Sequence, residues 1–113
     1  MKYFCGLIAA LILASSVYSG ELVRNTIIKE VANTNSGGKD FAILISGGTW
    51  TTTSTTCHVN KAITFPRAAF GSDQTYNQAF TIALTAMTTG QTVRIHNFNN
   101  DSCHEANFIS VSK

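Results

Sequence analysis

The chain has 113 residues, of which 44% are hydrophobic and 12% are charged, and its formal net charge is +2. This length predicts a single domain with a limited hydrophobic core. The charge is nearly balanced and forms no basic stripe or acidic tail, which argues against nucleic acid or an anionic membrane surface as the partner.

Residues 1–19 have the three parts of a secretory signal peptide. Lys2 supplies the basic start, an apolar run covers residues 7–14, and Val17 and Ser19 fit the small-x-small pattern before a cleavage point. The apolar run is shorter than the roughly 20 residues that span a bilayer. We therefore expect cleavage after Ser19 and no stable membrane anchor.

The mature chain is expected to be one domain over residues 20–113, secreted or periplasmic. Removal of Lys2 lowers the net charge from +2 to +1, and Cys5 leaves with the signal peptide. Cys57 and Cys103 remain, and an even pair in an exported protein is typical of a disulfide bond. Closing this loop of about 45 residues would stabilise the fold by on the order of 4 kcal/mol.

A metal site is one alternative for the two cysteines, because His58 follows Cys57 and His104 follows Cys103. Adjacent residues on a strand point to opposite faces, so the two Cys-His pairs would not easily bring four ligands to one ion. Free thiols are the other alternative. The sequence favours the disulfide and indicates no metal.

The first part of the mature chain predicts a β-hairpin. Residues 22–31 alternate β-branched and polar side chains, as in a strand with neither face fully dry. Residues 33–40 form a turn, and residues 41–46 form a nearly continuous apolar strand. The turn residues are Asn35, Ser36, Gly37 and Gly38, and Gly47 with Gly48 is expected to break or bulge the second strand.

Residues 49–56 are a Thr-rich run around Trp50. Threonine is a good strand former, so the simplest interpretation is a solvent-facing strand that residues 57–59 complete. The functional interpretation is a sugar site, because an aromatic ring can stack on the C–H face of a sugar while nearby hydroxyls bind its hydroxyls. The candidate ligand-binding residues are Trp50, Thr49, Thr51, Thr52 and Ser54.

Residues 72–90 have the clearest helical period in the chain. Ser72 can act as the N-cap, Asp73 places a negative charge in the first turn, and Gly90 suits a left-handed C-terminal position. One apolar stripe follows the spacing i, i+3, i+4, i+7, i+8 and i+11: Tyr76, Ala79, Phe80, Ala83, Leu84 and Met87.

Strands are expected on both sides of this helix. Residues 61–65 form one that ends at Pro66, and Phe65 and Phe70 are expected to pack near the helix N-terminus. Residues 92–98 alternate apolar and polar side chains, and residues 107–111 form the last strand. On the strand over residues 92–98, one face carries Val93 and Ile95, and the other carries Arg94, His96 and Phe98.

These elements together predict an α+β fold. We expect a small curved antiparallel β-sheet or an OB-like barrel that carries one amphipathic helix.

The titratable residues do not predict catalysis. An enzyme would need a nucleophile with a base, paired carboxylates or a metal, and the glycine pairs lack the lysine and helix of a phosphate loop. We therefore expect no enzymatic activity and no cofactor. Catalysis would require at least two of the following to converge in one pocket: His58, His96, His104, Asp101 and Glu105.

Residues 80–96, FTIALTAMTTGQTVRIH, resemble the binding subunits of pertussis-like AB5 toxins. In that family a helix ends in a similar Ser/Thr-Gly-Gln or Gly-Lys turn and leads into a Val-x-Ile or Val-x-Val strand. The resemblance implies an OB-like fold and a ring of subunits that binds surface glycans, but we carry over none of the family's sugar-contacting residues. The order of motifs is equally similar to small exported gammaproteobacterial proteins without an assigned function.

The sequence thus predicts a non-catalytic binding module with a glycan or another envelope component as ligand, and a homo-oligomer as the assembly that the resemblance implies. This hypothesis requires Trp50 to be partly exposed. The alternative is a periplasmic structural or protein-interaction protein that binds through a sheet edge or the polar face of the helix. That alternative would leave Trp50 buried.

Overall fold

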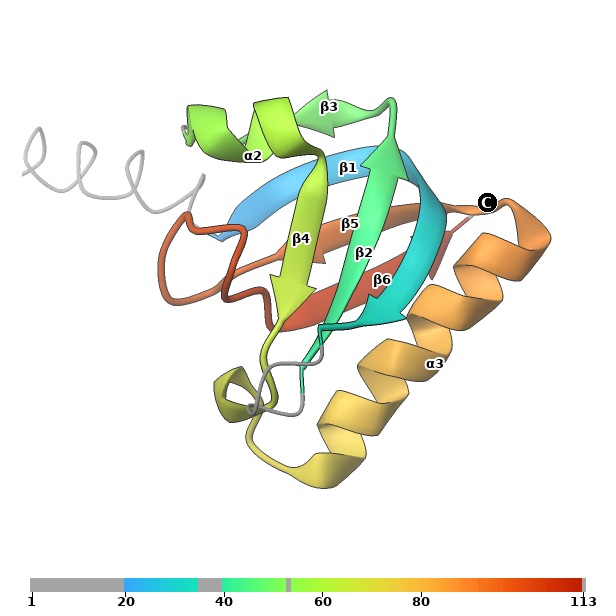
Figure 1. Cartoon of the computed structure of the whole chain (residues 1–113), viewed down its shortest axis with the longest axis vertical. Helices are drawn as coiled ribbons and strands as arrows, with labels where there is room; N and C mark the ends of the chain where they lie inside the picture. Colours follow the sequence, from blue (N-terminus) through green and yellow to red (C-terminus); the bar gives the residue numbers. More distant parts are fainter. Residues whose placement is uncertain (1–19, 35–39, 53, 113) are drawn as a thin grey trace, which may run out of the picture.

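The computed structural model describes residues 20–34, 40–52 and 54–112 (Figure 1). The predicted signal peptide, residues 1–19, and the predicted turn residues 35–38 lie outside the described residues. The elements in chain order are β1 (Glu21–Asn33), β2 (Phe41–Ser46), β3 (Thr49–Trp50), α2 (Thr55–Asn60), β4 (Ala62–Phe65), the 3-10 turn η1 (Arg67–Ala69), α3 (Asp73–Thr89), β5 (Thr92–His96) and β6 (Phe108–Ser112).

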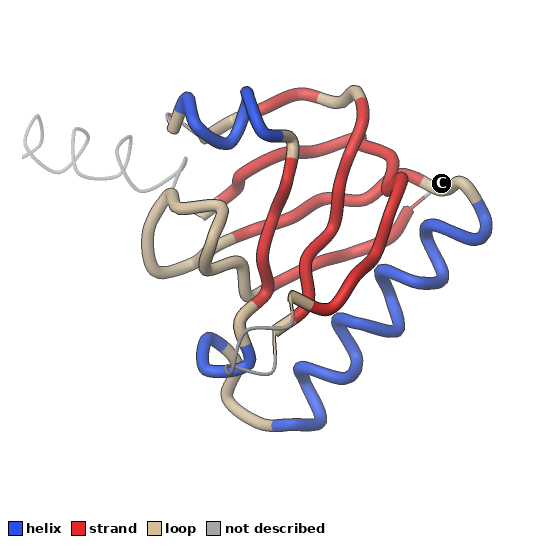
Figure 2. Tube along the Cα trace, in the orientation of Figure 1, coloured by secondary structure: helices blue, strands red, loops and turns tan. Residues whose placement is uncertain are grey.

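The strands form one antiparallel sheet in the order β4-β2-β1-β5-β6, and β3 pairs with the start of β1. The central strand, β1, curves strongly, as the trace in Figure 2 shows. Its register shifts between Val23 and Thr26 and again between Ile28 and Glu30, and Asn25 has a φ of 55°. Such bulges bend a strand and increase its twist. The predicted α+β fold, a curved antiparallel sheet with one main helix, α3, is confirmed.

The sheet is open, but its two edges approach each other. On β4, the Thr64 N–H donates to the Cys103 carbonyl oxygen at 2.9 Å, and the Thr64 carbonyl oxygen accepts from the Ala106 N–H at 3.1 Å. Residues 103–106 directly precede β6. The chain before β6, rather than β6 itself, therefore makes the contact between the two edges.

The boundaries of α3 agree with the predicted caps. The Ser72 side chain accepts a hydrogen bond from the Thr75 N–H at 3.2 Å, and Gly90 has a φ of 73°. These are the usual solutions for the unpaired N–H and C=O groups at helix ends. The predicted helix is confirmed.

The buried stripe of α3 differs from the predicted one, because it includes Ala86 in place of Phe80 and Leu84. Its fully buried members are Ala79, Ala83 and Ala86, whereas Phe80 and Leu84 remain 38% and 37% exposed. Alanine has a short side chain, so this stripe allows the helix backbone to lie close to the sheet. The larger side chains are consequently displaced to the flank of the helix.

An aromatic cluster joins β2 and β4 to α3. Phe41 stacks on Phe65 with ring centroids 4.6 Å apart, and it also contacts the rings of Tyr76 and Phe80. Phe70 packs edge-on against Tyr76 at 5.4 Å. The predicted packing of Phe70 near the helix N-terminus is confirmed.

The turn after β2 depends on glycine. Gly47 and Gly48 have φ values of 70° and 89°, a region that L-amino acid side chains disfavour. A Cβ atom on Gly48 would also lie 2.6 Å from the Arg24 carbonyl oxygen. The predicted break of the strand at these glycines is confirmed.

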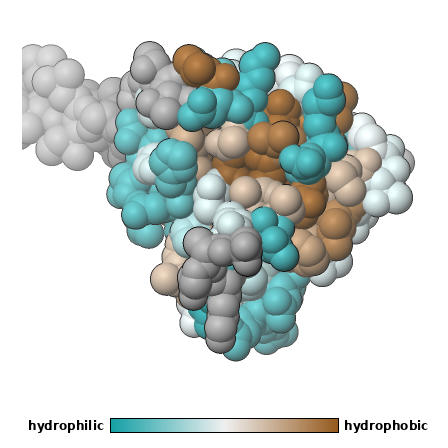
Figure 3. Space-filling model, in the orientation of Figure 1, coloured by the Kyte–Doolittle hydropathy of each residue, from teal (hydrophilic) through white to brown (hydrophobic). Residues whose placement is uncertain are grey.

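Several large apolar side chains are exposed on the sheet and helix. Ile27 on β1 and Leu44 on β2 are 44% and 41% exposed, comparable to Phe80 and Leu84 on α3. Figure 3 shows hydrophobic surface over β2 and beside α3, interrupted by hydrophilic side chains. This face of the molecule therefore mixes apolar and polar groups.

Candidate functional site

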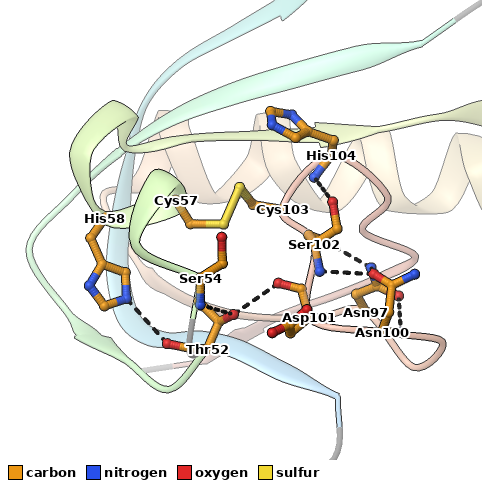
Figure 4. The surroundings of a disulfide bond; sticks show 10 residues. All are labelled: Thr52, Ser54, Cys57, His58, Asn97, Asn100, Asp101, Ser102, Cys103 and His104. Carbon is orange, nitrogen blue, oxygen red and sulfur yellow. Dashed lines mark hydrogen bonds between the residues drawn. A yellow bond between two sulfur atoms is a disulfide. The ribbon is translucent and has the colours of Figure 1, made fainter.

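The disulfide predicted from the cysteine count is present and joins two irregular parts of the fold. Cys57 lies on α2 and Cys103 lies in the loop before β6, with Cα atoms 5.8 Å apart (Figure 4). Both cysteines are buried. His58 and His104 lie on opposite sides of the bond in Figure 4, so the two Cys-His pairs are not directed to one point.

The prediction that residues 49–59 form one strand is wrong. Only Thr49 and Trp50 pair with β1, after which the backbone N–H groups of Thr51 and Thr52 both donate to the Leu22 carbonyl oxygen. The chain then enters α2. Threonine hydroxyls can bond to nearby or facing backbone groups and so compete with regular pairing, and the disulfide holds the short helix that follows.

The hydroxyls proposed as sugar-binding groups differ in their availability. The Thr51 hydroxyl donates to the Glu21 carbonyl oxygen at 2.8 Å, and the buried Thr52 hydroxyl donates to the Asp101 carbonyl oxygen at 2.9 Å. Ser54 lies just before α2, and its N–H donates to Thr52 Oγ1. Thr49 is exposed. Two of the five candidate residues therefore already bond to the protein backbone through their hydroxyls.

Trp50 is half-buried at the end of the sheet. Its indole packs against the core on one side, and its ring centroid lies 5.0 Å from that of His58, which is exposed. His58 Nε2 lies 3.3 Å from the Thr52 carbonyl oxygen. An aromatic surface beside the His58 imidazole is thus partly accessible to solvent. Thr49 is the cross-strand partner of Arg24 and lies on the opposite face of β3 from Trp50.

A second site, which the sequence did not predict, lies on the outer face of β1, β5 and β6. Cross-strand pairing places Arg94 beside Ser110 and His96 beside both Glu21 and Phe108. The face includes a cavity of about 330 Å³. Its lining residues are Glu21, Arg24, Asn25, Val93, Arg94, Ser110 and Ser112. We refer to these residues as the polar groove.

His96 borders the polar groove within a small aromatic cluster. Its ring lies 5.0 Å from that of Phe98 and 5.1 Å from that of Phe108. Among the described residues neither ring nitrogen has a hydrogen-bond partner, and Nε2 is 3.9 Å from Glu21 Oε2. Burial and the nearby Arg94 guanidinium lower the pKa of His96 below its ordinary value of 6.5, while Glu21 opposes this shift. A smaller lowering of the same pKa comes from Arg24.

The free energy of unfolding is expected to decrease as the pH falls below 6.5. Below this pH, His96 binds a proton more readily in the unfolded chain than in the folded chain, where its pKa is lowered. Protonation therefore favours the unfolded state. Urea unfolding at pH 7.5 and pH 5.5 measures this loss. His96→Phe keeps an aromatic ring against Phe98 and Phe108 but cannot titrate, so it should lose most of the pH dependence.

The exposed His104 provides the control for this experiment. His104→Gln removes a histidine from the neighbouring loop and should retain the pH dependence of the wild type. An equal decrease in stability for the wild type and His96→Phe would contradict the prediction.

The other titratable residues considered for catalysis are engaged separately. The Glu105 Oε2 atom accepts from Asn100 Nδ2 at 2.8 Å, and the Asp101 carbonyl oxygen accepts from Thr52. No group of three or more His, Cys, Asp or Glu residues in the described ranges could hold a metal ion. The helices within these ranges are all too short or too polar to span a bilayer.

Comparison with known families gave one match that covers nearly the whole chain. A family model described as a family of unknown function, DUF5992, matches residues 3–113. Neither a curated protein nor a solved structure matched. The chain therefore belongs to the family of unknown function DUF5992.

Proposed function

We propose that this protein is an exported, non-catalytic binding module that binds a carbohydrate at Trp50. The observation that carries the proposal is the half-buried state of Trp50, whose ring lies beside that of His58. A sugar can stack its C–H face on the indole while the His58 imidazole binds one of its hydroxyls. The hydroxyls of Thr51 and Thr52, which donate to backbone oxygens, act mainly by holding Trp50 in place.

Export is proposed from two features that agree with each other. Residues 1–19 have the pattern of a signal peptide, and the mature part of the chain contains a disulfide bond. Disulfides persist in the periplasm and outside the cell but are rare in the cytosol. We accordingly assign the protein to the periplasm or the extracellular space.

The resemblance of residues 80–96 to pertussis-like AB5 binding subunits suggests the assembly. It supports a ring of identical subunits that present their carbohydrate sites together, which would raise the avidity for a glycan surface. The resemblance concerns α3 and β5, and Trp50 lies on another element. The Trp50 site is thus our own assignment from its chemistry.

A glycan array with the purified oxidised protein tests the proposal, preceded by light scattering to determine its mass. Selective binding should be lost in Trp50→Ala and largely retained in Trp50→Phe, which keeps an aromatic face. Phe98→Ala is the matched control because Phe98 is an exposed aromatic residue elsewhere in the fold. If the wild type binds no glycan, or if Trp50→Ala binds as the wild type does, the carbohydrate site is wrong.

A protein-interaction role is the second candidate, and the exposed apolar side chains favour it. Ile27 and Leu44 lie on the sheet, and Phe80 and Leu84 lie on α3, each more than a third exposed. Exposed apolar groups of this kind often mark contacts with another protein. A second copy of the chain is the partner we propose for this face, and a Leu44→Glu variant should then lower the mass measured by light scattering.

A further inference from the structure

The polar groove is separate from Trp50 and has the features of a binding site for an anion. Its cavity of about 330 Å³ is at the lower end of the size range of small-ligand sites. Three strands contribute to it, with residues 21, 24 and 25 from β1, 93 and 94 from β5, and 110 and 112 from β6. A site on paired strands holds its side chains more rigidly than a loop does.

The charges in the polar groove leave an excess of one positive charge. Arg24 donates through Nε at 2.8 Å to Glu21 Oε1, and its second guanidinium nitrogen lies 2.7 Å from the same oxygen. The Arg94 side chain has no hydrogen bond or ion pair within the described part of the chain and is exposed. Glu21 therefore orients one guanidinium while the other remains available for a ligand.

Two serine hydroxyls add uncharged donors to the same groove. Ser110 is the direct cross-strand partner of Arg94, and Ser112 is the partner of Thr92. Neither serine side chain has a hydrogen bond to another described residue. Side chains of paired residues lie on the same face of a sheet, so the hydroxyl of Ser110 and the guanidinium of Arg94 can bind one ligand together.

The backbone of β1 is irregular at this groove. Asn25, which lines it, has a φ of 55° and lies in the register shift between Val23 and Thr26. Left-handed non-glycine residues cost free energy and cluster at binding sites, and bulges are common beside functional sites. The irregularity places Arg24 and Asn25 together at the edge of the cavity.

We propose that the polar groove binds a phosphate group, with Arg94 as its charge partner, the Glu21-oriented guanidinium of Arg24 as a further N–H donor and Ser110 as a hydroxyl donor. A planar carboxylate has two oxygens to satisfy, whereas a terminal phosphate has three that point in different directions. Guanidinium groups from two strands and hydroxyls from a third provide donors from several directions, which suits the tetrahedral anion. This proposal does not depend on the carbohydrate site.

Amide chemical shifts of the ¹⁵N-labelled oxidised protein test the proposal during titration with inorganic phosphate at constant ionic strength. Saturable shifts should appear at residues 21–25, 93–96 and 110–112. Acetate, in a parallel titration, should bind at least several-fold more weakly. A third titration with glycerol 3-phosphate distinguishes a phosphate ester from free phosphate as the ligand. Tighter binding of glycerol 3-phosphate than of inorganic phosphate indicates an ester, and weaker binding indicates the free anion.

Arg94→Gln should weaken phosphate binding by about tenfold or more, because it removes a charge-assisted contact. The matched control is Lys29→Gln, which removes one positive charge from an exposed position of β1 that does not line the groove. This control should bind phosphate as the wild type does. Because Arg94 is exposed, its replacement should leave the fold intact. An amide spectrum of the variant that changes only near residue 94 would show this.

Three results would overturn the phosphate site. They are shifts that do not saturate or that spread over the whole surface, acetate binding as tightly as phosphate, and equal weakening by Arg94→Gln and Lys29→Gln. None of these results bears on Trp50, and a failed glycan array has no effect on the phosphate titration. The two proposals therefore fail separately.

Discussion

Replacement of Phe41 by alanine is expected to lower the free energy of unfolding by about 3–5 kcal/mol. Phe41 is 2% exposed, stacks on Phe65 and contacts the rings of Tyr76 and Phe80 on α3. Removal of the Phe41 side chain leaves a cavity between β2, β4 and α3, and the surrounding rings can fill this cavity only partly. Urea unfolding of the oxidised protein at pH 7.5 measures the change.

Phe98→Ala is the matched control for this measurement. Phe98 is 56% exposed and makes ring contacts only with His96 and Phe108 among the described residues. Its removal should cost about 1 kcal/mol, the usual scale of aromatic pair contacts. Equal losses for the two variants would show that α3 does not depend on the aromatic cluster for its packing.

The double variant Cys57→Ala, Cys103→Ala is expected to lose about 4 kcal/mol of stability. The disulfide closes a loop with a sequence separation of 46. In the chain-entropy model, breaking a loop of this length raises the entropy of the unfolded chain and so stabilises the unfolded state by about 4 kcal/mol. Alanine leaves little strain because it is smaller than cysteine. Urea unfolding should therefore show a lower midpoint for the double variant than for the oxidised wild type.

Local and global effects of the disulfide can be separated. α2 has six residues, which is too short to persist as an isolated helix, so its amides should exchange with solvent faster in the double variant. A reducing agent should lower the midpoint of the wild type to that of the double variant and leave the double variant unchanged. A double variant as stable as the oxidised wild type would refute this role of the bond.

The parts of the fold that were predictable from the sequence are those specified by local signals. The helix α3 has a polar cap at Ser72, a glycine at its end and a regular apolar period, and each of these acts within a few residues. The strand β2 is a short apolar run between turn residues. Neither element needs information from distant parts of the chain.

The short helix α2 shows why a local signal can mislead. Threonine favours strands, but its hydroxyl also bonds to backbone groups, and here Thr51 and Thr52 bond to oxygens 30 and 49 positions away. Lys61 then ends the helix in a left-handed conformation. The hydrogen-bond partners of Thr51 and Thr52 come from distant segments. The strand preference of threonine therefore gave no information about these hydrogen bonds.

The polar groove was unpredictable for a related reason. The alternation of residues 92–98 placed Arg94 and His96 on one face, but it did not identify the residues beside them. Ser110 and Glu21 become neighbours of these side chains only through the register of three strands. A shift of one residue in that register would turn every side chain to the opposite face.

The position of β1 has a consequence for when the protein can fold. It is the first strand in the described chain, yet its initial residues pair with β5, the second-last strand of the described residues. Contacts between distant segments slow folding, and this half of the sheet cannot form before the C-terminal strands are available. For a chain exported as proposed, premature folding before translocation is disfavoured by strand order itself.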